Sequence, residues 1–503
     1  MAKIVFLSLY DVNAEGLRTL SSILKQHGHQ PFIIFLKKYS RQRPVSGEPD
    51  DNDWIGINMQ GRPFGHAIGK EISDQEKAIC LQLIKRIEPD WIGMSVTTPL
   101  RQMSSELTRL IKKTFDLPII WGGPAPTTEP ERCAQDCDYV CIGEGERPVV
   151  ELARHCDLGK SIASVPNMAY LGPNGLVKNP MFPLVEDLNT LPFKDIHPQD
   201  KFLIAKGKLI ENFSEVSYSR SLKYHIISSR GCPYSCSYCC ENHYKNLYMP
   251  QVFLRRRSPS HVIEELKEAK GQLDCRIVQF EDEIFARDLA WLEEFATLYR
   301  NEIKLPFICY LFPDKDIVRR IQILKEAGLI LTCLGLQSGS QKTNREIYHR
   351  PYNRELMMKT AAALRTLKIE YYVDVITHNP LETEEDLKAT LDALLELPKP
   401  YWLCLNKLSV IKGTDISSLM TPEIKEWAKQ KDVQQLFDYY SRLYWLAPFT
   451  GIHKHTAAAL QKIKFFRRNP HFINPLLLNL PFYSLYYAKK GSKRIKHLFR
   501  SGT

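Results

Sequence analysis

The chain has 503 residues, of which 44% are apolar and 25% are charged, the composition of an ordinary globular protein with two or more cores. This composition excludes disordered, collagen-like and disulfide-scaffold proteins. The formal net charge of +11 is unevenly distributed, because residues 439–503 contain twelve Lys or Arg and no Asp or Glu, so that the rest of the chain sums to 11 − 12 = −1. A near-neutral body argues against nucleic-acid binding over a broad surface.

The first residues, MAKIVFLSLYD, predict a core strand rather than a signal peptide, since one Lys and a short apolar run lead at once into acidic residues. No run in the sequence reaches the roughly 18 apolar residues of a membrane-spanning helix. We therefore expect a cytoplasmic protein.

Residues 1–156 alternate short β-rich runs with helical periodicity, which predicts a doubly wound, Rossmann-like parallel sheet with crossover helices. Five strands are expected to begin at Lys3, Pro31, Trp91, Pro118 and Tyr139. The expected helices cover residues 15–26, 75–87, 103–113 and 147–155. A polar insertion, at about 37–73, interrupts the pattern. Ligands of such domains bind beyond the carboxyl ends of the strands.

A Pro- and Asn-rich connector follows over residues 157–222 and contains a hairpin with a Pro-Asn-Gly turn. The alternation restarts over residues 223–415, where six strand and helix units predict a partial (β/α)6 barrel. Residues 416–503 are predicted to form a helical, basic C-terminal region.

Cys232, Cys236 and Cys239 have the spacing C-x3-C-x2-C directly after the first strand of the second series. Three thiolates on one short loop can bind three irons of a four-iron cubane and leave the fourth iron open to a small ligand. Gly, Pro and Ser around them indicate an exposed loop, and we interpret the adjacent Cys240 as packing beneath it.

This loop, with Tyr238 before the last cysteine, resembles the radical S-adenosylmethionine (SAM) superfamily. FEDEIF (280–285) stands where that superfamily has carboxylates for the amino group of SAM, and LGLQSGS (334–340) resembles its GxESGS element. VITHNPLET (375–383) departs from the usual G-x-P-G-E-T element. The resemblance implies a [4Fe-4S] cluster on the three cysteines and SAM contacts from Tyr238, Glu281, Asp282, Glu283, Gln337 and Ser338.

A doubly wound domain ahead of such a barrel resembles the cobalamin (B12)-binding subgroup of that superfamily. DVNAEG (11–16) is similar to the D-x-H-x-x-G element of cobalamin mutases, with Asn13 in place of the cobalt-ligating His. The resemblance implies cobalamin contacts from Asp11, Asn13, Gly16, Ser95, Thr97, Gly122 and Gly123. It also implies a cobalt without a protein His ligand.

The implied activity is a cobalamin-dependent radical SAM methyltransferase, in which a 5′-deoxyadenosyl radical activates an unactivated carbon for methylation. Flavodoxin or ferredoxin would donate the electron, and the substrate would be a small or lipid-like molecule. The alternatives are a cobalamin-dependent cyclase or rearrangement enzyme without methyl transfer, an RNA methylthiotransferase, and a non-enzymatic corrinoid or redox sensor.

The region 465–500 mixes aromatic and Leu residues with eight of the chain's cations. Such a segment suits an anionic membrane surface. A helical extension packed on the barrel and an RNA-binding segment are alternative interpretations. The first of these interpretations predicts that the cytoplasmic protein makes peripheral contact with a membrane through this region.

Overall fold

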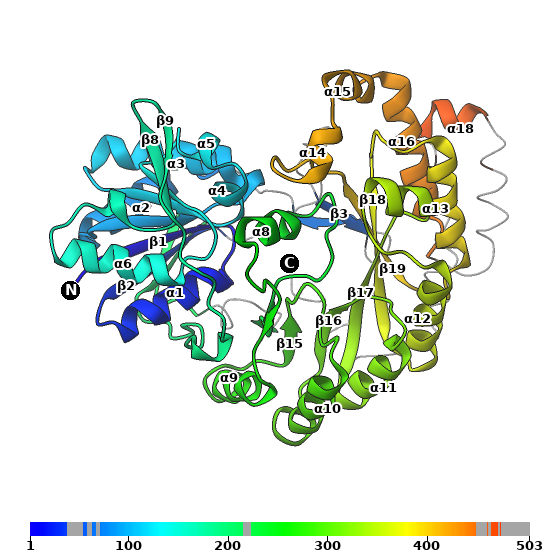
Figure 1. Cartoon of the computed structure of the whole chain (residues 1–503), viewed down its shortest axis with the longest axis horizontal. Helices are drawn as coiled ribbons and strands as arrows, with labels where there is room; N and C mark the ends of the chain where they lie inside the picture. Colours follow the sequence, from blue (N-terminus) through cyan, green and yellow to red (C-terminus); the bar gives the residue numbers. More distant parts are fainter. Residues whose placement is uncertain are drawn as a thin grey trace.

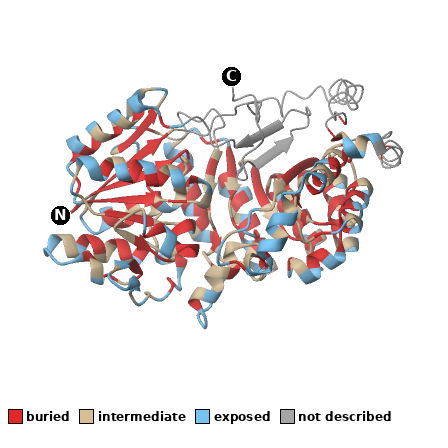
Figure 2. Ribbon diagram, turned by 90° about the horizontal axis from the view of Figure 1, so that it is seen from above, coloured by how far each residue is buried: buried red, intermediate tan, exposed pale blue. Residues whose placement is uncertain are grey.

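The computed structural model describes residues 1–37, 54–57, 63–66, 71–214, 223–448, 460, 464–470 and 473. It has two lobes, each built around a mainly parallel sheet, as Figure 1 shows. Both sheets are buried along most of their length beneath helices (Figure 2). The membrane prediction for 465–500 lies almost wholly outside the described residues.

The five strands predicted for the first domain form the centre of its sheet, in the parallel order β2-β1-β5-β6-β7. Their bounds are β1 Lys3–Leu9, β2 Gln30–Leu36, β5 Trp91–Ser95, β6 Ile119–Gly122 and β7 Tyr139–Cys141. The predicted doubly wound fold is confirmed. The order of strands reverses between β1 and β5, which is the switch point where such sheets bind ligands.

Helices cover both faces of this sheet because each carries one apolar stripe. Helices α1 (Glu15–Gln26) and α6 (Glu146–Asp157) lie side by side on one face. Helices α2 (Asp74–Ile87) and α3 (Arg101–Thr114) pack on the other. The short α4 (Pro124–Thr128) and α5 (Pro130–Cys133) join β6 to β7.

The segment 157–222, which we predicted to be a connector, contributes four strands to the edges of the same sheet. The expected hairpin is present as β8 (Met168–Gly172) and β9 (Gly175–Lys178), and β8 pairs antiparallel with β7. At the opposite edge β10 (Lys201–Ala205) pairs parallel with β2 and carries β11 (Lys208–Glu211). The sheet therefore has nine strands, and this segment is part of the first lobe rather than a plain linker.

The second sheet contains the six predicted barrel strands, all parallel and in chain order. Their bounds are β12 Lys223–Ile226, β15 Ile277–Phe280, β16 Phe307–Leu311, β17 Leu329–Gln337, β18 Glu370–Thr377 and β19 Trp402–Lys407. The helices between them are α9 Pro259–Gln272, α10 Leu289–Leu298, α11 Ile317–Ala327, α12 Arg354–Thr366 and α13 Glu384–Glu396. Side-chain caps begin four of these helices, for example Thr383 at α13, where a capping box satisfies the first backbone N–H groups. The predicted partial barrel is confirmed.

The polar insertion of the first domain contributes to the barrel. Its strands β3 (Trp54–Ile57) and β4 (Pro63–His66) form a hairpin whose first strand pairs antiparallel with β19. An open barrel has an unpaired edge at its last strand, and β3 satisfies the backbone groups there.

Helix α8 (Cys240–Tyr248) lies between the two lobes in Figure 1. Beside it the strands β13 (Ser229–Arg230) and β14 (Arg255–Arg256) form a two-stranded sheet. The described C-terminal elements are α14 (Asp415–Leu419), α15 (Pro422–Ala428), α16 (Lys431–Tyr444) and α18 (Lys464–Arg468). Helix α16 packs on α13 and α18 packs on α16. Within the described ranges no helix combines the length and the apolar character that crossing a bilayer requires.

Candidate active site between the two sheets

Two cavities lie next to each other where the lobes meet. The larger, of about 410 Å³, is enclosed by the carboxyl ends of the first sheet, by α8 and by the barrel mouth. The smaller, of about 180 Å³, lies in the barrel mouth. Glu241 and Glu283 line both cavities, so these two carboxylates stand at the junction.

The three predicted cluster ligands, Cys232, Cys236 and Cys239, all line the smaller cavity. Their loop is fixed to the barrel because the amide and the hydroxyl of Ser237 donate to the carbonyls of Tyr348 (2.9 Å) and Ile347 (2.5 Å). Within the described chain no three His, Cys, Asp or Glu side chains converge tightly enough to hold a single metal ion. A cubane does not require such convergence, since each thiolate binds a different iron. The three thiols on one cavity wall fit the cluster.

The fourth cysteine of the motif, Cys240, does not line the smaller cavity. It is the first residue of α8, and its thiol hydrogen-bonds with that of Cys239. Cys240 thus adjoins the three thiols without lining their cavity, and its role as support for the loop stays a prediction.

The acidic element after β15 divides its three carboxylates among different partners. Asp282 is 1% exposed and accepts hydrogen bonds from the amide and hydroxyl of Ser228 (3.1 and 2.7 Å) and from the hydroxyl of Ser229 (2.5 Å). Glu281 pairs with Nδ1 of His225 at 2.6 Å and lines the larger cavity. Glu283 remains as the carboxylate that faces the smaller cavity, which we call the cluster cavity because the three cysteines line it. It is therefore the best placed of the three for the amino group of SAM, whereas Asp282 supports the loop.

The other predicted SAM contacts separate in the same way. Tyr238 and Gln337 line the smaller cavity, and Gln337 ends β17 with a positive φ of 60°. Ser338 lies off the cavity wall, because its hydroxyl donates to Glu382 at 2.7 Å within the fold. The sequence did not single out Arg350, which lines this cavity with its Nη1 3.8 Å from Sγ of Cys236.

Four of the seven predicted cobalamin contacts line the larger cavity, namely Gly16, Ser95, Gly122 and Gly123. The other three, Asp11, Asn13 and Thr97, are not among its lining residues. Asp11 and Asn13 instead shape the loop before α1: Oδ1 of Asp11 accepts from the amide of Asn13 (2.9 Å), whose carbonyl accepts from Nε of Arg18 (2.8 Å).

The larger cavity suits a flat ligand with a buried tail. The part of the cavity between the first sheet and helices α1 and α6 is apolar. Its wall includes Phe6, Leu17, Trp91 and Leu152. Glycines stand on the wall at the end of β6 (Gly122 and Gly123) and after β7 (Gly143 and Gly145), where backbone can approach a ligand closely. These features fit cobalamin.

Helix α8 supplies cavity residues that sequence reasoning missed. Glu241, Tyr244 and Tyr248 lie three and four positions apart, so they share one face of the helix, and all three line the larger cavity. The hydroxyl of Tyr248 accepts from the amide of Glu144 at 2.7 Å. A Cβ at Gly143 would lie 2.0 Å from that hydroxyl oxygen, so the approach of the two lobes requires glycine there. The i, i+3, i+7 spacing of these three residues is the signal by which the sequence could have indicated that they share a face.

Charged residues fasten the first domain to the cluster loop. Glu144 accepts hydrogen bonds from Arg230 (3.0 Å) and from Arg255 (2.8 and 3.1 Å), and Glu146 accepts from Arg230 (2.6 Å). Arg230 precedes the cluster loop and Arg255 pairs with it across β13–β14. We refer to these four residues as the interdomain clasp.

The cobalt should lack a nitrogen ligand from the protein. No histidine lies among the described residues that line the larger cavity. Cys141 does line it, but burial raises the pKa of this thiol to about 12, which keeps it protonated and a poor ligand. Electron paramagnetic resonance of the Co(II) form should therefore show no hyperfine splitting from a histidine nitrogen. A three-line nitrogen splitting that disappears when the protein histidines are labelled with ¹⁵N would contradict this expectation.

Two family models match the chain. The radical SAM superfamily model matches residues 226–394, which contain the barrel from the end of β12 to α13. The B12 binding domain model matches residues 67–153, which contain β5 to β7 and, among the residues that line the larger cavity, Ser95, Gly122 and Gly123. These domains bind a [4Fe-4S] cluster and SAM in the barrel and cobalamin in the first lobe.

Three known proteins resemble the chain. It is 21% identical over 417 residues to cytidylyl-2-hydroxyethylphosphonate methyltransferase of Streptomyces wedmorensis, covering 75% of this chain and 72% of that protein. It is 25% identical to the anaerobic magnesium-protoporphyrin IX monomethyl ester cyclase of Rubrivivax gelatinosus, over 55% of this chain and 48% of that protein. The solved structure of the radical SAM methyltransferase TsrM from Kitasatospora setae with cobalamin and a [4Fe-4S] cluster has a TM-score of 0.61 at 17% identity, covering 83% of this chain and 77% of that chain.

The TsrM structure supports the fold, and the two models identify its two parts. Together with cysteines on the wall of the barrel cavity, they settle the family. The chain belongs to the radical SAM superfamily, among its enzymes with an N-terminal B12-binding domain.

Proposed function

We propose that this enzyme transfers a methyl group from SAM, by way of the corrinoid, to an unactivated carbon of a small molecule. The observation that carries the proposal is the junction at Glu241 and Glu283, where the larger cavity, which fits the corrinoid, meets the cluster cavity. A substrate at this junction could meet both cofactors. The similarity to a methyltransferase over 75% of the chain supports methyl transfer over ring formation.

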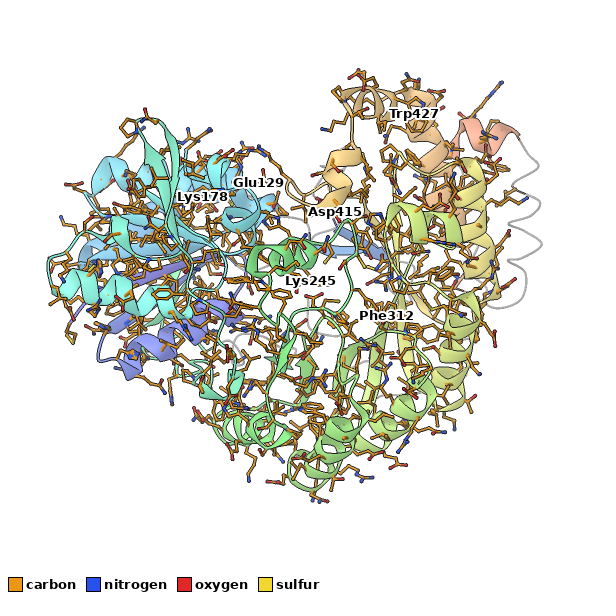
Figure 3. All side chains as sticks on the ribbon, in the orientation of Figure 1. Glu129, Lys178, Lys245, Phe312, Asp415 and Trp427 are labelled. Carbon is orange, nitrogen blue, oxygen red and sulfur yellow. The ribbon has the colours of Figure 1, made fainter. Side chains whose placement is uncertain are left out.

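The bound groups would supply a carbon radical from SAM and a methyl carrier in the corrinoid. The chain's own residues contribute orientation and exclusion of water. Ile284, Leu311 and Phe312 form apolar wall of the cluster cavity. In Figure 3, Phe312 lies on the barrel side and Lys245 on α8, the helix between the lobes. The interdomain clasp holds the first domain over this space.

Enzymes of this superfamily need a one-electron reductant. We propose flavodoxin or ferredoxin as the donor. For localisation and substrate, the basic region 465–500 leads us to propose contact with an anionic membrane surface and a small or lipid-like methyl acceptor.

Methyl transfer can be tested before the acceptor is known. Anaerobic protein with cluster and cobalamin should be incubated with SAM carrying a CD₃ group and a chemical reductant. Mass spectrometry of the extracted corrinoid should then show the CD₃ label, and the supernatant should contain 5′-deoxyadenosine. Protein in which Cys232 is replaced by Ala serves as the control that lacks reductive cleavage.

Formation of 5′-deoxyadenosine without label on the corrinoid would contradict methyl transfer. That outcome would favour the alternative of a cobalamin-dependent cyclase or rearrangement enzyme.

A further inference from the structure

Asp374 is a carboxylate in the barrel lumen to which the cofactors assign no role. It lies in β18, and its side chain lines the cluster cavity together with Cys333 and Tyr310 from the two preceding strands. Strand alternation places Asp374 on the lumen face, because its neighbours Val373 and Val375 are buried in the core outside the barrel.

The protein gives this carboxylate only weak partners. Sγ of Cys333 donates to Oδ2 of Asp374 at 2.9 Å, and Cys404, its register partner on β19, also hydrogen-bonds to it. Thiols are weak donors. Asp374 is half-buried at the cavity wall, and within the described chain no Lys, Arg or His lies within ion-pair distance of it. Burial raises the pKa of Asp374, and the two thiol hydrogen bonds and the charge of Arg350 oppose that rise.

Arg350, the one basic side chain among the described residues of the cavity wall, is engaged elsewhere. Arg350 donates to the carbonyl of Gly335 (3.0 Å), approaches Sγ of Cys236 and stacks over the ring of Phe312 at 4.8 Å. The described wall thus carries three carboxylates, Glu241, Glu283 and Asp374, against one guanidinium.

A second carboxyl group on this wall has an oxygen without a partner among the described residues. Oε2 of Glu241 is buried at the junction of the cavities and has no hydrogen-bond partner among the described residues. The space between the cofactors therefore presents, to a molecule that enters it, three carboxyl groups that form no ion pair with a basic side chain of the described residues.

We propose that Asp374 binds a protonated nitrogen of the methyl acceptor, so that the substrate is a small organic cation such as a primary ammonium compound. This inference rests on the proposed function and specifies its substrate class. A charge-assisted hydrogen bond would give this half-buried carboxylate a charged partner and position the acceptor beside SAM.

Deuterated probes of equal size test the inference. The holoenzyme should be incubated with SAM, titanium(III) citrate and perdeuterated butylammonium, butanol or butyrate. One electron from titanium cleaves the S–C5′ bond of SAM to methionine and a C5′ radical. That radical breaks a C–D bond of a bound probe and becomes monodeuterated 5′-deoxyadenosine, while the probe radical is methylated or is reduced by a second titanium(III) with uptake of a proton.

We expect at least about tenfold more deuterium in 5′-deoxyadenosine from butylammonium than from butanol, which is the fold-change a hydrogen bond to a charged group is worth. Asp374→Asn should remove that preference, and Asp374→Glu should retain part of it. Asp392→Asn, at an exposed position of α13, should leave it unchanged. Saturation-transfer NMR without reductant should show the same preference in binding.

Equal labelling from the three probes, or no labelling while 5′-deoxyadenosine still forms, would overturn the inference. A loss of SAM affinity of more than about tenfold in Asp374→Asn, with iron and cobalt content intact, would overturn it as well and assign the carboxylate to SAM. Failure of the proposed function differs from both, because the corrinoid would then gain no CD₃ label in the wild-type protein.

Discussion

Replacing Cys232, Cys236 and Cys239 together with Ala should reduce the iron and sulfide content of the protein to background and abolish reductive cleavage of SAM. The three thiols line one cavity, and a cubane held by one loop has no other cysteine on that wall except Cys333, whose thiol is directed to Asp374. Iron and sulfide analysis and the absorbance of the cluster measure the first effect, and chromatography of 5′-deoxyadenosine measures the second.

Cys240→Ala is the matched control, since Cys240 adjoins the motif but does not line the cavity. It should keep both the cluster and SAM cleavage. Loss of the cluster in this variant, or its retention in the triple variant, would contradict the ligand set.

Removing Glu144 should destabilise the contact between the lobes more than any surface substitution. Glu144→Ala leaves Arg255, which is 6% exposed at its side chain, and Arg230 without their shared carboxylate. Breaking such a buried pair costs about 3 kcal/mol. The free energy of unfolding, from urea denaturation of the holoprotein, should fall by that amount, and cobalamin should dissociate more readily because Glu144 lines its cavity.

Glu151→Ala provides the comparison, because Glu151 pairs with Arg154 at the surface of α6 at 2.7 Å and such pairs contribute at most about 1 kcal/mol. Equal destabilisation by the two substitutions would contradict the role assigned to the interdomain clasp.

The clasp also has an expected pH dependence. Burial alone would raise the pKa of Glu144, but the hydrogen bonds and charges of Arg255 and Arg230 outweigh burial and lower it below its ordinary value of 4.5. A group with a lowered folded pKa contributes its full stability above the unfolded pKa and loses it as the pH falls through the folded pKa. The difference in stability between wild type and Glu144→Gln should therefore shrink as the pH falls below 4.5.

The presence of the central strands and the approximate helix bounds could be predicted because each follows from local periodicity. The prediction of 15–26 for the first helix matches α1 at both ends, and the helix at 147–155 differs from α6 by one and two residues. The cysteine loop could be predicted because its ligands lie close together in the chain.

The pairing of strands at the sheet edges could not be predicted, because it depends on which edge strands have unpaired backbone groups once the central sheet has formed. The hairpin β3–β4 arises in a polar insertion of the first domain and pairs with β19, about 350 residues later. Strand β10 looked like part of a connector and pairs with β2 for the same reason.

The roles of individual site residues also depend on contacts between residues that are far apart in the sequence. Asp282 stands in the acidic element, but the chain turn after β15 directs it to Ser228 and Ser229, and only Glu283 of its neighbours faces the cluster cavity. The clasp joins Glu144 to residues 86 and 111 positions away, which no spacing rule connects.

The central claim is that one chain holds an iron–sulfur cluster and a corrinoid on either side of a shared junction. Anaerobically purified and reconstituted protein should contain iron and sulfide in the amounts of a four-iron cluster, about four of each per chain, with cobalt equimolar to the chain. Electron paramagnetic resonance of the reduced cluster and Co(II) in the same sample should show magnetic interaction between them. Full cluster content without any retained cobalt would contradict the account.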